Sequence, residues 1–464
     1  MYISGQHTPV RIAFVGGGSL NWAMGLMADL AYDTQLAADV RLYDIDFQAA
    51  KRNCEIGNRF ADVSRGQPAT YKACETLERA LNGADIIVIS ILPGQFSDMA
   101  QDLGIPAHFG IPQSVGDTVG PGGFVRALRA IPMMTSIAHS IRDHAPNAFV
   151  CNLTNPMSVL TGALFSAYPN IRAWGECHEV TKIRKQVAWI ANQENGENKY
   201  EFRDVAVNVL GINHFTFVDA ISLNGRDMLP AYRAFVAAYS NSGWEQSDPD
   251  KDSEHQLYFG SKNLVAFDLL RRFGIPAAAG DRHLAEFFPS ADYLSDPQRW
   301  GFALTPVDYR IKDRKAKLAR ADSMRSGETP PLAHRSEEAL IDQIKALMRG
   351  DTFVSNVNLP NQGQLAGLPK GTIVETNAFF SDLGVKPIFA GQLPHSLLPI
   401  VADHAARQTE LLTATQNEDR GALFDLFHAD PLVAHLQTKD AQDMFDQMLG
   451  ATAAWLPETL SGAA

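Results

Sequence analysis

Two short segments in the middle of the chain carry residues that bind transition metals. Cys177 and His178 stand in WGECHEV, and His214 stands in GINHF. A thiolate and an imidazole bind a divalent transition ion well, and such an ion keeps positions open for the oxygens of a substrate. Taken singly, a cysteine is commonly a small buried hydrophobe and a histidine is commonly only hydrogen-bonded. The residues alone therefore leave both a metal site and two separate structural roles open.

A glycine-rich segment near the start of the chain has the features of a dinucleotide site. The run RIAFVGGGSLN, residues 11–21, is an apolar strand followed by three glycines and Ser19. Glycine lets the backbone approach a pyrophosphate, and the N–H groups of the following helix face the anion. Gly16 and Gly18 match the first two glycines of the fingerprint G-x-G-x-x-G, whereas Asn21 stands at the third position. The alternative is a tight strand–helix turn that binds nothing.

Asp44 strengthens the dinucleotide interpretation, because it ends a second apolar run, VRLYD. A carboxylate at that place accepts hydrogen bonds from ribose hydroxyls and repels a 2′-phosphate, which predicts NAD rather than NADP. Asp46 is the neighbouring alternative for this role. A third apolar run ends in residues 90–94, where Pro93 is predicted to face the nucleotide, since the carboxyl ends of parallel strands line the ligand crevice.

Two loops carry polar residues that are candidates for holding a sugar. Asn155, before Pro156 in CNLTNP, is either a plain turn residue or an amide that binds a hydroxyl. Asp117 and Thr118 lie in the loop SVGDTVGPGG, which is either a flexible turn or a lid over the ligand.

A third candidate is the densely charged run GDRHLAEFFP, which contains Asp281, Arg282, His283 and Glu286. Such a run is usually a solvated face or an internal ion pair, but the flanking AAAG and FFP make this one less solvated. A carboxylate here with a raised pKa can act as a base, and Arg282 can form a fork with a carboxylate ligand.

These residues must be positioned by alternating strands and helices. Apolar strand-like runs are predicted at 11–15, 40–46, 84–92 and 149–156, with helices at 20–33 and 124–145 among them. The run ADIIVISIL is almost unbroken in its apolar character, as expected for a parallel strand covered on both faces. The alternation predicts an α/β protein that begins with a Rossmann-like doubly wound parallel sheet.

The second half of the chain is less regular. The predicted elements are a strand–turn–strand unit at 205–223, an amphipathic helix at 261–274, an exposed helix and loop at 311–338, and helices from Leu397 onward. A chain of 464 residues is too long for one ordinary core. We therefore expect a NAD-binding domain at 1–172 and a mixed α/β (α+β) domain at 173–464 for metal and substrate binding and for oligomerisation.

Charge and cysteine content restrict the partners and the compartment. The net charge of −12 argues against nucleic acid and acidic membranes as partners. The four cysteines are scattered, which indicates reduced thiols rather than a disulfide framework. The chain does not begin with a basic segment and an apolar core, and no apolar run reaches the roughly 18 residues needed to span a bilayer. We expect a cytoplasmic protein without nucleic-acid or membrane partners.

Taken together, these segments resemble the NAD-dependent family 4 glycoside hydrolases, an exception to the two-carboxylate scheme of most glycosidases. The resemblance rests on VGGGS, the NP turn after the fourth strand, CH at 177–178 and NHF at 213–215, and it spans nearly the whole chain. Asn21 in place of the third glycine also fits this family. The runs SVGDTVGPGG, CHEV, NVLGINHFT, AAGDRHLAEF, NVNLPNQGQ and VETNAF are most similar to the alpha-galacturonidase branch.

The resemblance implies an unusual reaction that needs NAD and a divalent metal, commonly Mn²⁺. NAD removes hydride from C3 of the sugar, the ketone acidifies the hydrogen at C2, and a base removes that hydrogen while the glycosidic oxygen leaves. Water then adds to the alkene and the hydride returns, so NAD is not consumed. The metal polarises the oxygens on C2 and C3 as a Lewis acid. The resemblance also implies a homodimer or a homotetramer.

Carried over residue by residue, the resemblance assigns Cys177 and His214 to the metal, as Mn²⁺ or another divalent ion. Asn155 matches a substrate-binding asparagine. His178 follows the metal cysteine, where family members place the group that assists the leaving oxygen.

The base and the substrate contacts follow less directly from the resemblance. Some relatives use a tyrosine as base and others an aspartate, so Asp281 is the expected base and Tyr258 is the alternative. Asp117 is expected to contact the sugar. The branch implies a terminal alpha-linked galacturonate, whose C6 carboxylate is expected to pair with Arg282 or His283.

Other functions stay open. The same mechanism is possible on an alpha-glucuronide, an alpha-glucoside, a 6-phospho-sugar or a sulfoquinovoside. A NAD-dependent 2-hydroxy acid dehydrogenase shares the nucleotide lobe but leaves Cys177 and His214 unexplained. A catalytically silent sugar-binding protein is the third possibility.

Overall fold

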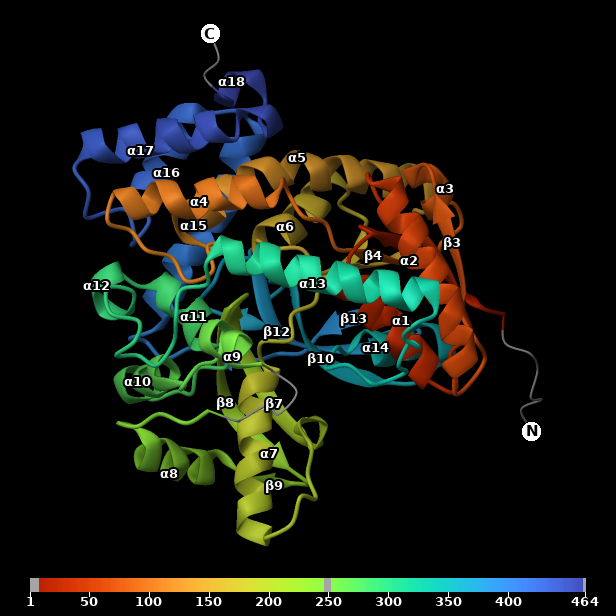
Figure 1. The fold of residues 1–464 in the computed structure, drawn as a ribbon. Helices are drawn as coiled ribbons and strands as arrows, with labels where there is room; N and C mark the ends of the chain where they lie inside the picture. The colour runs from red at the N-terminus through yellow and green to blue at the C-terminus, as the bar shows by residue number, and fades with distance from the viewer. Residues whose placement is uncertain (1–7, 246–251, 462–464) are drawn as a thin grey trace.

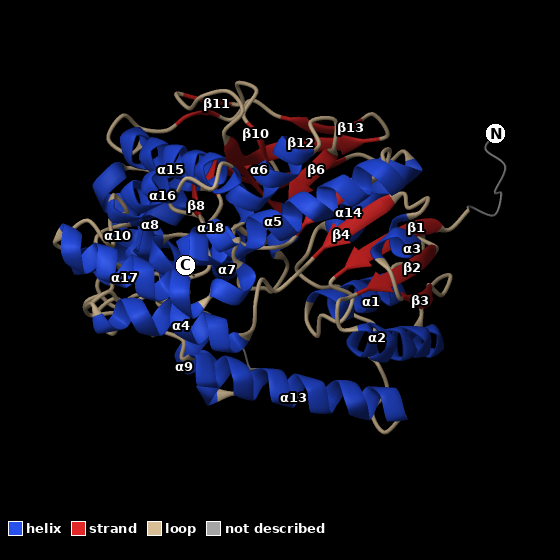
Figure 2. Ribbon diagram, turned by 90° about the horizontal axis from the view of Figure 1, so that it is seen from above, coloured by secondary structure: helices blue, strands red, loops and turns tan. Residues whose placement is uncertain are grey.

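The computed structural model describes residues 8–245 and 252–461, and its centre is one nine-stranded sheet (Figures 1 and 2). Six parallel strands come first in the chain: β1 Val10–Val15, β2 Ala38–Tyr43, β3 Thr70–Cys74, β4 Ile86–Ile89, β5 Phe149–Asn152 and β6 Arg172–Gly175. Three later strands extend the sheet beyond β6 in antiparallel pairing: β10 Phe353–Pro360, β12 Ile373–Ser381 and β13 Gly384–Pro387. The order is β13-β12-β10-β6-β5-β4-β1-β2-β3, with β1 and β4 side by side.

Helices connect the parallel strands and cover both faces of the sheet. They are α1 Trp22–Tyr32, α2 Phe47–Arg59, α3 Leu77–Leu81, α4 Phe96–His108, α5 Gly120–His144 and α6 Met157–Ala167. The strand residues of β4 are all buried, as the apolar run predicted. The predicted Rossmann-like α/β fold is therefore confirmed.

The middle of the chain forms a smaller sheet with its own helices, seen below the large sheet in Figure 1. The small sheet contains β7 Val205–Ile212, β8 Phe215–Leu223 and β9 Arg226–Asp227. The helices of this part are α7 Thr181–Asn195, α8 Leu229–Tyr239, α9 Ser253–Phe259, α10 Leu264–Phe273, α11 Asp281–Leu284 and α12 Ser290–Tyr293. The predicted strand–turn–strand unit around His214 is thus the β7–β8 hairpin.

The remaining helices lie mostly in the last third of the chain. They are α13 Val307–Ser326, α14 Leu340–Arg349, α15 Leu398–Gln416, α16 Arg420–His428, α17 Thr438–Ala451 and α18 Glu458–Ser461. Short 3₁₀ turns and a two-stranded pair complete the fold: η1 Phe60–Val63, η2 Phe202–Asp204, η3 Ala285–Phe287, η4 Ala453–Trp455, β11 Leu365–Ala366 and β14 Gly391–Gln392. In the described part of the chain, no helix combines the length and the apolar character that crossing a membrane requires.

Helix α13 runs along the outside of the molecule and packs against both α2 and α4 (Figure 1). Its carboxyl end lies beside the nucleotide half, where Arg59 Nη1 donates to the carbonyl oxygen of Arg325 at 3.3 Å. The exposed charged helix that the sequence predicted is confirmed, and it starts earlier than expected, at Val307.

Element boundaries differ from the predicted ones where a loop begins. The run predicted as a strand at 84–92 is paired only over β4, because the neighbouring strands β1 and β5 end at Val15 and Asn152, opposite Ile89. The division predicted at residue 172 falls at the start of β6, and strands from beyond it complete the same sheet. The two-domain division stays a prediction.

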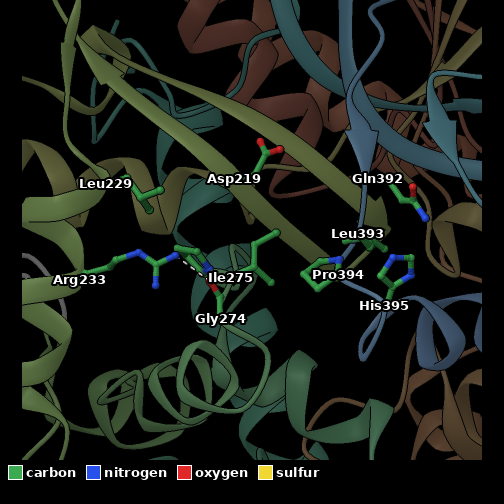
Figure 3. Close-up of a pocket in the computed structure, with 10 residues that line it drawn as sticks. Asp219, Leu229, Arg233, Gly274, Ile275, Gln392, Leu393, Pro394 and His395 are labelled. Carbon is green, nitrogen blue, oxygen red and sulfur yellow. Dashed lines mark hydrogen bonds between the residues drawn. The ribbon is translucent and has the colours of Figure 1, made fainter.

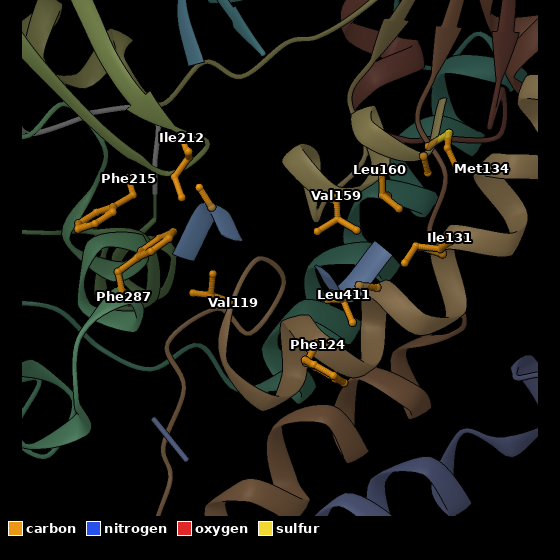
Figure 4. Packing of buried hydrophobic residues seen from close by; sticks show 14 of the residues in the cluster. Val119, Phe124, Ile131, Met134, Val159, Leu160, Ile212, Phe215, Phe287 and Leu411 are labelled. Atoms are coloured by element: carbon orange, nitrogen blue, oxygen red, sulfur yellow. The ribbon is translucent and has the colours of Figure 1, made fainter. Parts of the chain in front are cut away.

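The largest hydrophobic cluster joins the large sheet to the β7–β8 hairpin (Figure 4). Phe215 stacks on Phe287 with 4.5 Å between ring centroids and 7° between ring planes. Both phenylalanines are fully buried. Because Phe215 follows His214 directly and Phe287 follows α11, this stack holds two candidate site segments against each other.

Candidate active site

The three glycines form a turn between the carboxyl ends of β1, β2 and β4. The backbone N–H groups of Gly16 and Gly17 both donate to the Tyr43 carbonyl oxygen at 2.8 Å. Gly16 has φ +92°, and a Cβ atom there would lie 1.9 Å from the carbonyl oxygen of Ser90. Only glycine fits this position, for conformational and steric reasons together.

Asp44 faces this turn and Asp46 does not. One carboxylate oxygen of Asp44 accepts from the Gly18 N–H at 2.9 Å, and the other accepts from the Asp46 N–H at 2.9 Å. Asp46 instead caps α2 by accepting from the Ala49 N–H at 3.1 Å. Of the two sequence candidates for the ribose hydroxyls, the geometry therefore favours Asp44.

The surroundings of the turn fit a dinucleotide. Ser19 accepts from the Trp22 N–H at 3.1 Å, which sets the start of α1 behind the glycines. Pro93 is buried at the end of β4, beside Leu92, which is 43% exposed. Ile45, next to Asp44, is 88% exposed.

Three side chains from distant segments meet at a candidate metal centre. Asp117, His214 and His283 each place a potential ligand atom so that all three lie within 4.8 Å of one another. His214 occupies the turn between β7 and β8 at φ +63°. Its ring lies 3.7 Å from that of His283, between centroids. Asp117 and His283 were predicted to contact the sugar, and the structure brings both side chains to His214.

Thr118 sets the orientation of two of these ligands. Its hydroxyl donates to an Asp117 carboxylate oxygen at 2.7 Å and lies 2.8 Å from Nδ1 of His214. Since the hydroxyl has one hydrogen, Nδ1 of His214 is then the donor to Thr118 and Nε2 carries no proton. This tautomer leaves Nε2 available to a metal ion.

The electrostatics of the centre suit a cation. Burial lowers the pKa of His214, so its ring is neutral at neutral pH, as a metal ligand must be. Burial acts to raise the pKa of Asp117, but His283, His214 and Arg126 outweigh that effect and lower the pKa below its usual range. Neutral imidazoles and one carboxylate form a donor set that fits Mn²⁺ or a similar divalent ion.

Cys177 lies outside this group of three. The residue is 8% exposed, and its carbonyl oxygen accepts from the Asn356 side chain at 3.2 Å. Burial, with Glu375 and Glu179 nearby, raises the pKa of the thiol well above its usual value. A metal would therefore have to displace the thiol proton to gain this ligand. The Cys177–His214 pairing stays a prediction.

A buried carboxylate links the segments of Cys177 and His214. Glu375 on β12 is 1% exposed and accepts from three side-chain amides: Asn213 at 3.1 Å, Asn356 at 2.9 Å and Asn358 at 3.3 Å. Asn213 precedes His214, and Asn356 also bonds the Cys177 carbonyl oxygen. Burial raises the pKa of Glu375 to about 6. Glu375, Asn356 and Asn358 stand in the runs NVNLPNQGQ and VETNAF, whose residue types alone do not show this contact.

His178 is more exposed than the neighbouring Cys177 and than His214. Its side chain is 40% exposed, and Nδ1 lies 3.0 Å from a Glu338 carboxylate oxygen. The Trp22 ring of α1 lies 5.8 Å away, between centroids. Enclosure acts to lower the pKa of His178, but the bond to Glu338 outweighs it and raises the pKa to about 9. The ring is therefore charged at neutral pH.

Glu179 ties the CHEV segment to the GDRH segment. Its carboxylate accepts from Lys182 Nζ at 2.7 Å and from the Gly280 N–H at 2.8 Å. The same carboxylate lies 4.0 Å from Nε2 of His283. The sequence does not identify Glu179 as a site residue, because nothing in CHEV shows that the segment of Gly280 and His283 packs against it.

The two candidates for the base have different surroundings. Asp281 is fully buried, and its carboxylate accepts from the Ala266 N–H at 3.0 Å and from the Ser261 hydroxyl at 2.8 Å. These contacts cap the start of α10. Burial raises the pKa of Asp281 to about 6. Tyr258 is half-buried at the end of α9, with its ring 4.9 Å from that of Tyr309.

Asn155 keeps an open hydrogen-bonding group. Its amide nitrogen donates to Asp117 at 3.3 Å, and its backbone oxygen accepts from Arg126 Nε at 3.1 Å. The side-chain oxygen is buried and has no partner among residues 8–245 and 252–461. A buried oxygen without a donor is expected to accept from a ligand hydroxyl.

A surface hollow elsewhere does not belong to this site. It has a volume of about 340 Å³ and is lined by residues of β8, α8 and the β14 region, including Asp219, Arg233 and His395 (Figure 3). None of the predicted site residues lines it.

Comparisons with known proteins give consistent matches along the chain. The model of the family 4 glycosyl hydrolases matches residues 11–193, and that of their C-terminal domain matches residues 209–433. An alpha-galacturonidase of Thermoanaerobacter italicus is 43% identical over 442 residues, covering 95% of each chain. One of Bacillus subtilis is 44% identical over 441 residues, covering 95% of this chain and 97% of its own.

Solved structures share the fold. The crystal structure of lplD from Bacillus subtilis has a TM-score of 0.90 at 42% identity, over 95% of this chain and 99% of its own. A 6-phospho-alpha-glucosidase from gut microorganisms, in complex with NAD and Mn²⁺, has a TM-score of 0.81 at 19% identity, over 97% and 99%. At that identity the second likeness concerns the fold alone.

Proposed function

Because the chain belongs to family 4 of the glycosyl hydrolases, we propose that it is an alpha-galacturonidase that removes terminal alpha-linked galacturonate with the help of NAD and a divalent metal, Mn²⁺ or a similar ion. The observation that carries the proposal is the meeting of Asp117, His214 and His283 beside an unpartnered oxygen of Asn155. A cation centre next to a hydroxyl-binding amide suits a sugar rather than an apolar ligand.

The chain's own residues have separate binding tasks in this proposal. The glycine turn lets a pyrophosphate approach the backbone at the start of α1, and Asp44 accepts from ribose hydroxyls. Asp117, His214 and His283 hold the metal, with Cys177 as an additional ligand after loss of its proton. When bound, NAD accepts and returns the C3 hydride, and the metal polarises the oxygens on C2 and C3.

His178 donates a proton to the leaving oxygen in this proposal. Its Nδ1 is held by Glu338, so that Nε2 is the nitrogen left to face a ligand. The 40% exposure of the side chain gives a substrate access to it. A general acid must reach within hydrogen-bond distance of the departing oxygen, and an exposed ring on a loop can do so.

Tyr258 is the base in this proposal, in place of Asp281, which was the first choice from the sequence. Both oxygens of Asp281 are engaged at the start of α10, which gives this carboxylate a structural task. The test compares Tyr258→Phe with Asp281→Asn by measuring exchange of the C2 hydrogen with solvent. Tyr258→Phe should stop the exchange in a folded protein, whereas Asp281→Asn should mainly lower the unfolding temperature; the opposite result makes Asp281 the base.

The function itself is tested with an aryl alpha-galacturonide. NAD-stripped protein should hydrolyse it only after NAD and Mn²⁺ are added back, and NADH should not accumulate. Full activity of stripped protein or of chelator-treated protein would contradict the proposal. Steady formation of NADH from a 2-hydroxy acid would instead identify a dehydrogenase.

A further inference from the structure

Two arginines gather around one aromatic ring close to the candidate metal centre. The guanidinium carbon of Arg282 lies 4.8 Å from the centroid of the Phe259 ring, and that of Arg310 lies 5.8 Å from the same centroid. Arg282 comes from α11, Phe259 from α9 and Arg310 from α13. Cation–π contacts hold both guanidinium groups at this ring, although their like charges repel each other.

The charges of these arginines are not neutralised by direct partners. Arg282 is 9% exposed and donates from Nη2 to two uncharged groups, the Ser114 carbonyl oxygen at 3.1 Å and the Thr305 hydroxyl. Within residues 8–245 and 252–461, the buried Nε atoms of Arg282 and Arg310 have no hydrogen-bond partner. Across the described ranges, neither residue belongs to an ion pair, whereas the buried Arg129 pairs with Asp102 at 2.6 Å.

Nearby carboxylates are committed to other groups. Glu286 accepts from the Val115 N–H at 2.7 Å and the Gly116 N–H at 3.0 Å, and burial raises its pKa to about 7. Asp117 belongs to the candidate metal centre. Buried cations without a counter-ion are costly, so an anionic ligand is expected here.

The position of Arg282 and Arg310 relative to the candidate metal centre indicates which kind of anion they would bind. The loop at residues 114–118 runs from the Arg282 contact at Ser114 to Asp117 and Thr118 of the metal centre. In a hexopyranose, C2 and C3 lie on the side of the ring opposite to C5 and C6. A sugar whose O2 and O3 reach the metal therefore points its C6 group away from it, and a planar C6 carboxylate matches a guanidinium fork.

We propose that Arg310, together with Arg282, forms the subsite for the C6 carboxylate of a hexuronide, and that Arg310 is the residue that selects uronides over neutral sugars. This inference rests on the proposed function for the identity of the sugar. It adds Arg310 to the residues that the sequence predicted. Nothing in the sequence distinguishes Arg310, because six other basic residues follow it within the same helix, between residues 311 and 325.

The test uses Arg310→Gln in the full chain, with Arg320→Gln as the control because Arg320 is an exposed arginine on the same helix. Loss of a charge-assisted bond to a carboxylate should lower kcat/KM for an aryl alpha-galacturonide by about 30-fold or more. The kcat/KM for the matching aryl alpha-galactoside should change by about 3-fold or less. Arg320→Gln should leave both values unchanged. Equal losses on both substrates would overturn the role of Arg310 in selection.

Direct binding separates this inference from the proposed function. Calorimetry measures galacturonate, galactose and galactose 6-phosphate with the wild-type protein and with Arg310→Gln. We expect galacturonate to bind more tightly than galactose, with the difference removed in Arg310→Gln. If this binding pattern is found but the protein does not hydrolyse a galacturonide, the carboxylate subsite is supported and the proposed function is rejected. An equal affinity of the wild-type protein for galacturonate and galactose, or tighter binding of the phosphate than of the carboxylate, would overturn the subsite.

Discussion

The nucleotide turn and the candidate metal centre are built in opposite ways. The turn is built from consecutive elements, since residues 16–44 cover the loop after β1, then α1 and β2, and its contacts are mostly to backbone atoms. The metal centre takes Asp117, His214 and His283 from three segments far apart in the chain, and their side chains make the contacts. Only the first arrangement is fixed by local chain geometry; the second depends on long-range packing such as the Phe215–Phe287 stack.

This contrast predicts that damage to the metal centre and damage to the turn are independent. A substitution in one region should leave ligand binding in the other nearly unchanged, because distant sites without shared partners act additively.

The largest expected effect is that of His214→Ala. Removing a ligand from the centre should abolish stoichiometric Mn²⁺ binding and lower kcat by about 1000-fold or more, while NAD affinity stays within about 3-fold. Mass spectrometry measures the bound Mn²⁺, and a fluorescence titration measures the affinity for NAD. His395→Ala is the control, because His395 is exposed and lies outside the centre. Retention of bound metal by His214→Ala would show that the centre is elsewhere.

Gly16→Ala should damage the other region. The added Cβ would lie 1.9 Å from the Ser90 carbonyl oxygen, so the turn must move. We expect NAD affinity to fall by about 30-fold and the free energy of unfolding to fall by about 2–3 kcal/mol, with Mn²⁺ binding retained.

Gly25→Ala is its matched control. Gly25 lies within α1 and has free space around its Cβ position, so the substitution should raise stability by about 0.5–1 kcal/mol. Unfolding in denaturant measures both variants, and equal behaviour of the two would refute the steric argument.

Glu375→Gln tests the packing that joins the segments of the metal centre. The carboxylate of Glu375 accepts from three asparagine amides with two oxygens, whereas a glutamine side chain has only one oxygen to accept from them. We expect Mn²⁺ affinity to fall by about 10-fold, as for other groups that orient metal ligands, with little change in NAD affinity. Glu410→Gln, at an exposed position of α15, should change neither. An unchanged Mn²⁺ affinity in Glu375→Gln would exclude this positioning role.

The smallest expected effect is a shift in pH dependence. Glu338 raises the pKa of His178 to about 9. The charged imidazole is therefore present at neutral pH and loses its proton as the pH rises through about 9. In Glu338→Gln the pKa of His178 should fall, so the alkaline limb of kcat should move to lower pH by about one unit or more. An alkaline limb at the same pH in both proteins would separate His178 from the proton transfer.

The sequence predicted the parts of the molecule that local rules decide. Apolar runs and glycines gave β1, β4, α1 and the turn at Gly16, because a strand–turn–helix unit needs only neighbouring residues. The strand predicted at 84–92 was too long, because its pairing ends at Ile89, where both neighbouring strands also end.

The rest depends on contacts between distant segments. Asp117 and His283 were named as sugar contacts, since their spacing in the chain does not show that the β7–β8 turn brings His214 to them. Glu375 stands in VETNAF, whose role the residues alone do not show, and Glu338 and Arg310 lie in segments without a motif. Only the packing of β12, of the loop before α14 and of α13 shows what these three side chains contact. The contribution of β10, β12 and β13 to the first sheet was likewise not predicted.

The central claim is that the sugar is oxidised, loses its C2 hydrogen and is reduced again during each turnover. Hydrolysis of an aryl alpha-galacturonide in D₂O, followed by NMR of the released galacturonate, tests it most directly. We predict deuterium at C2 of the product and none at C3. A product that keeps its original hydrogen at C2 in full, at complete hydrolysis, would contradict the account.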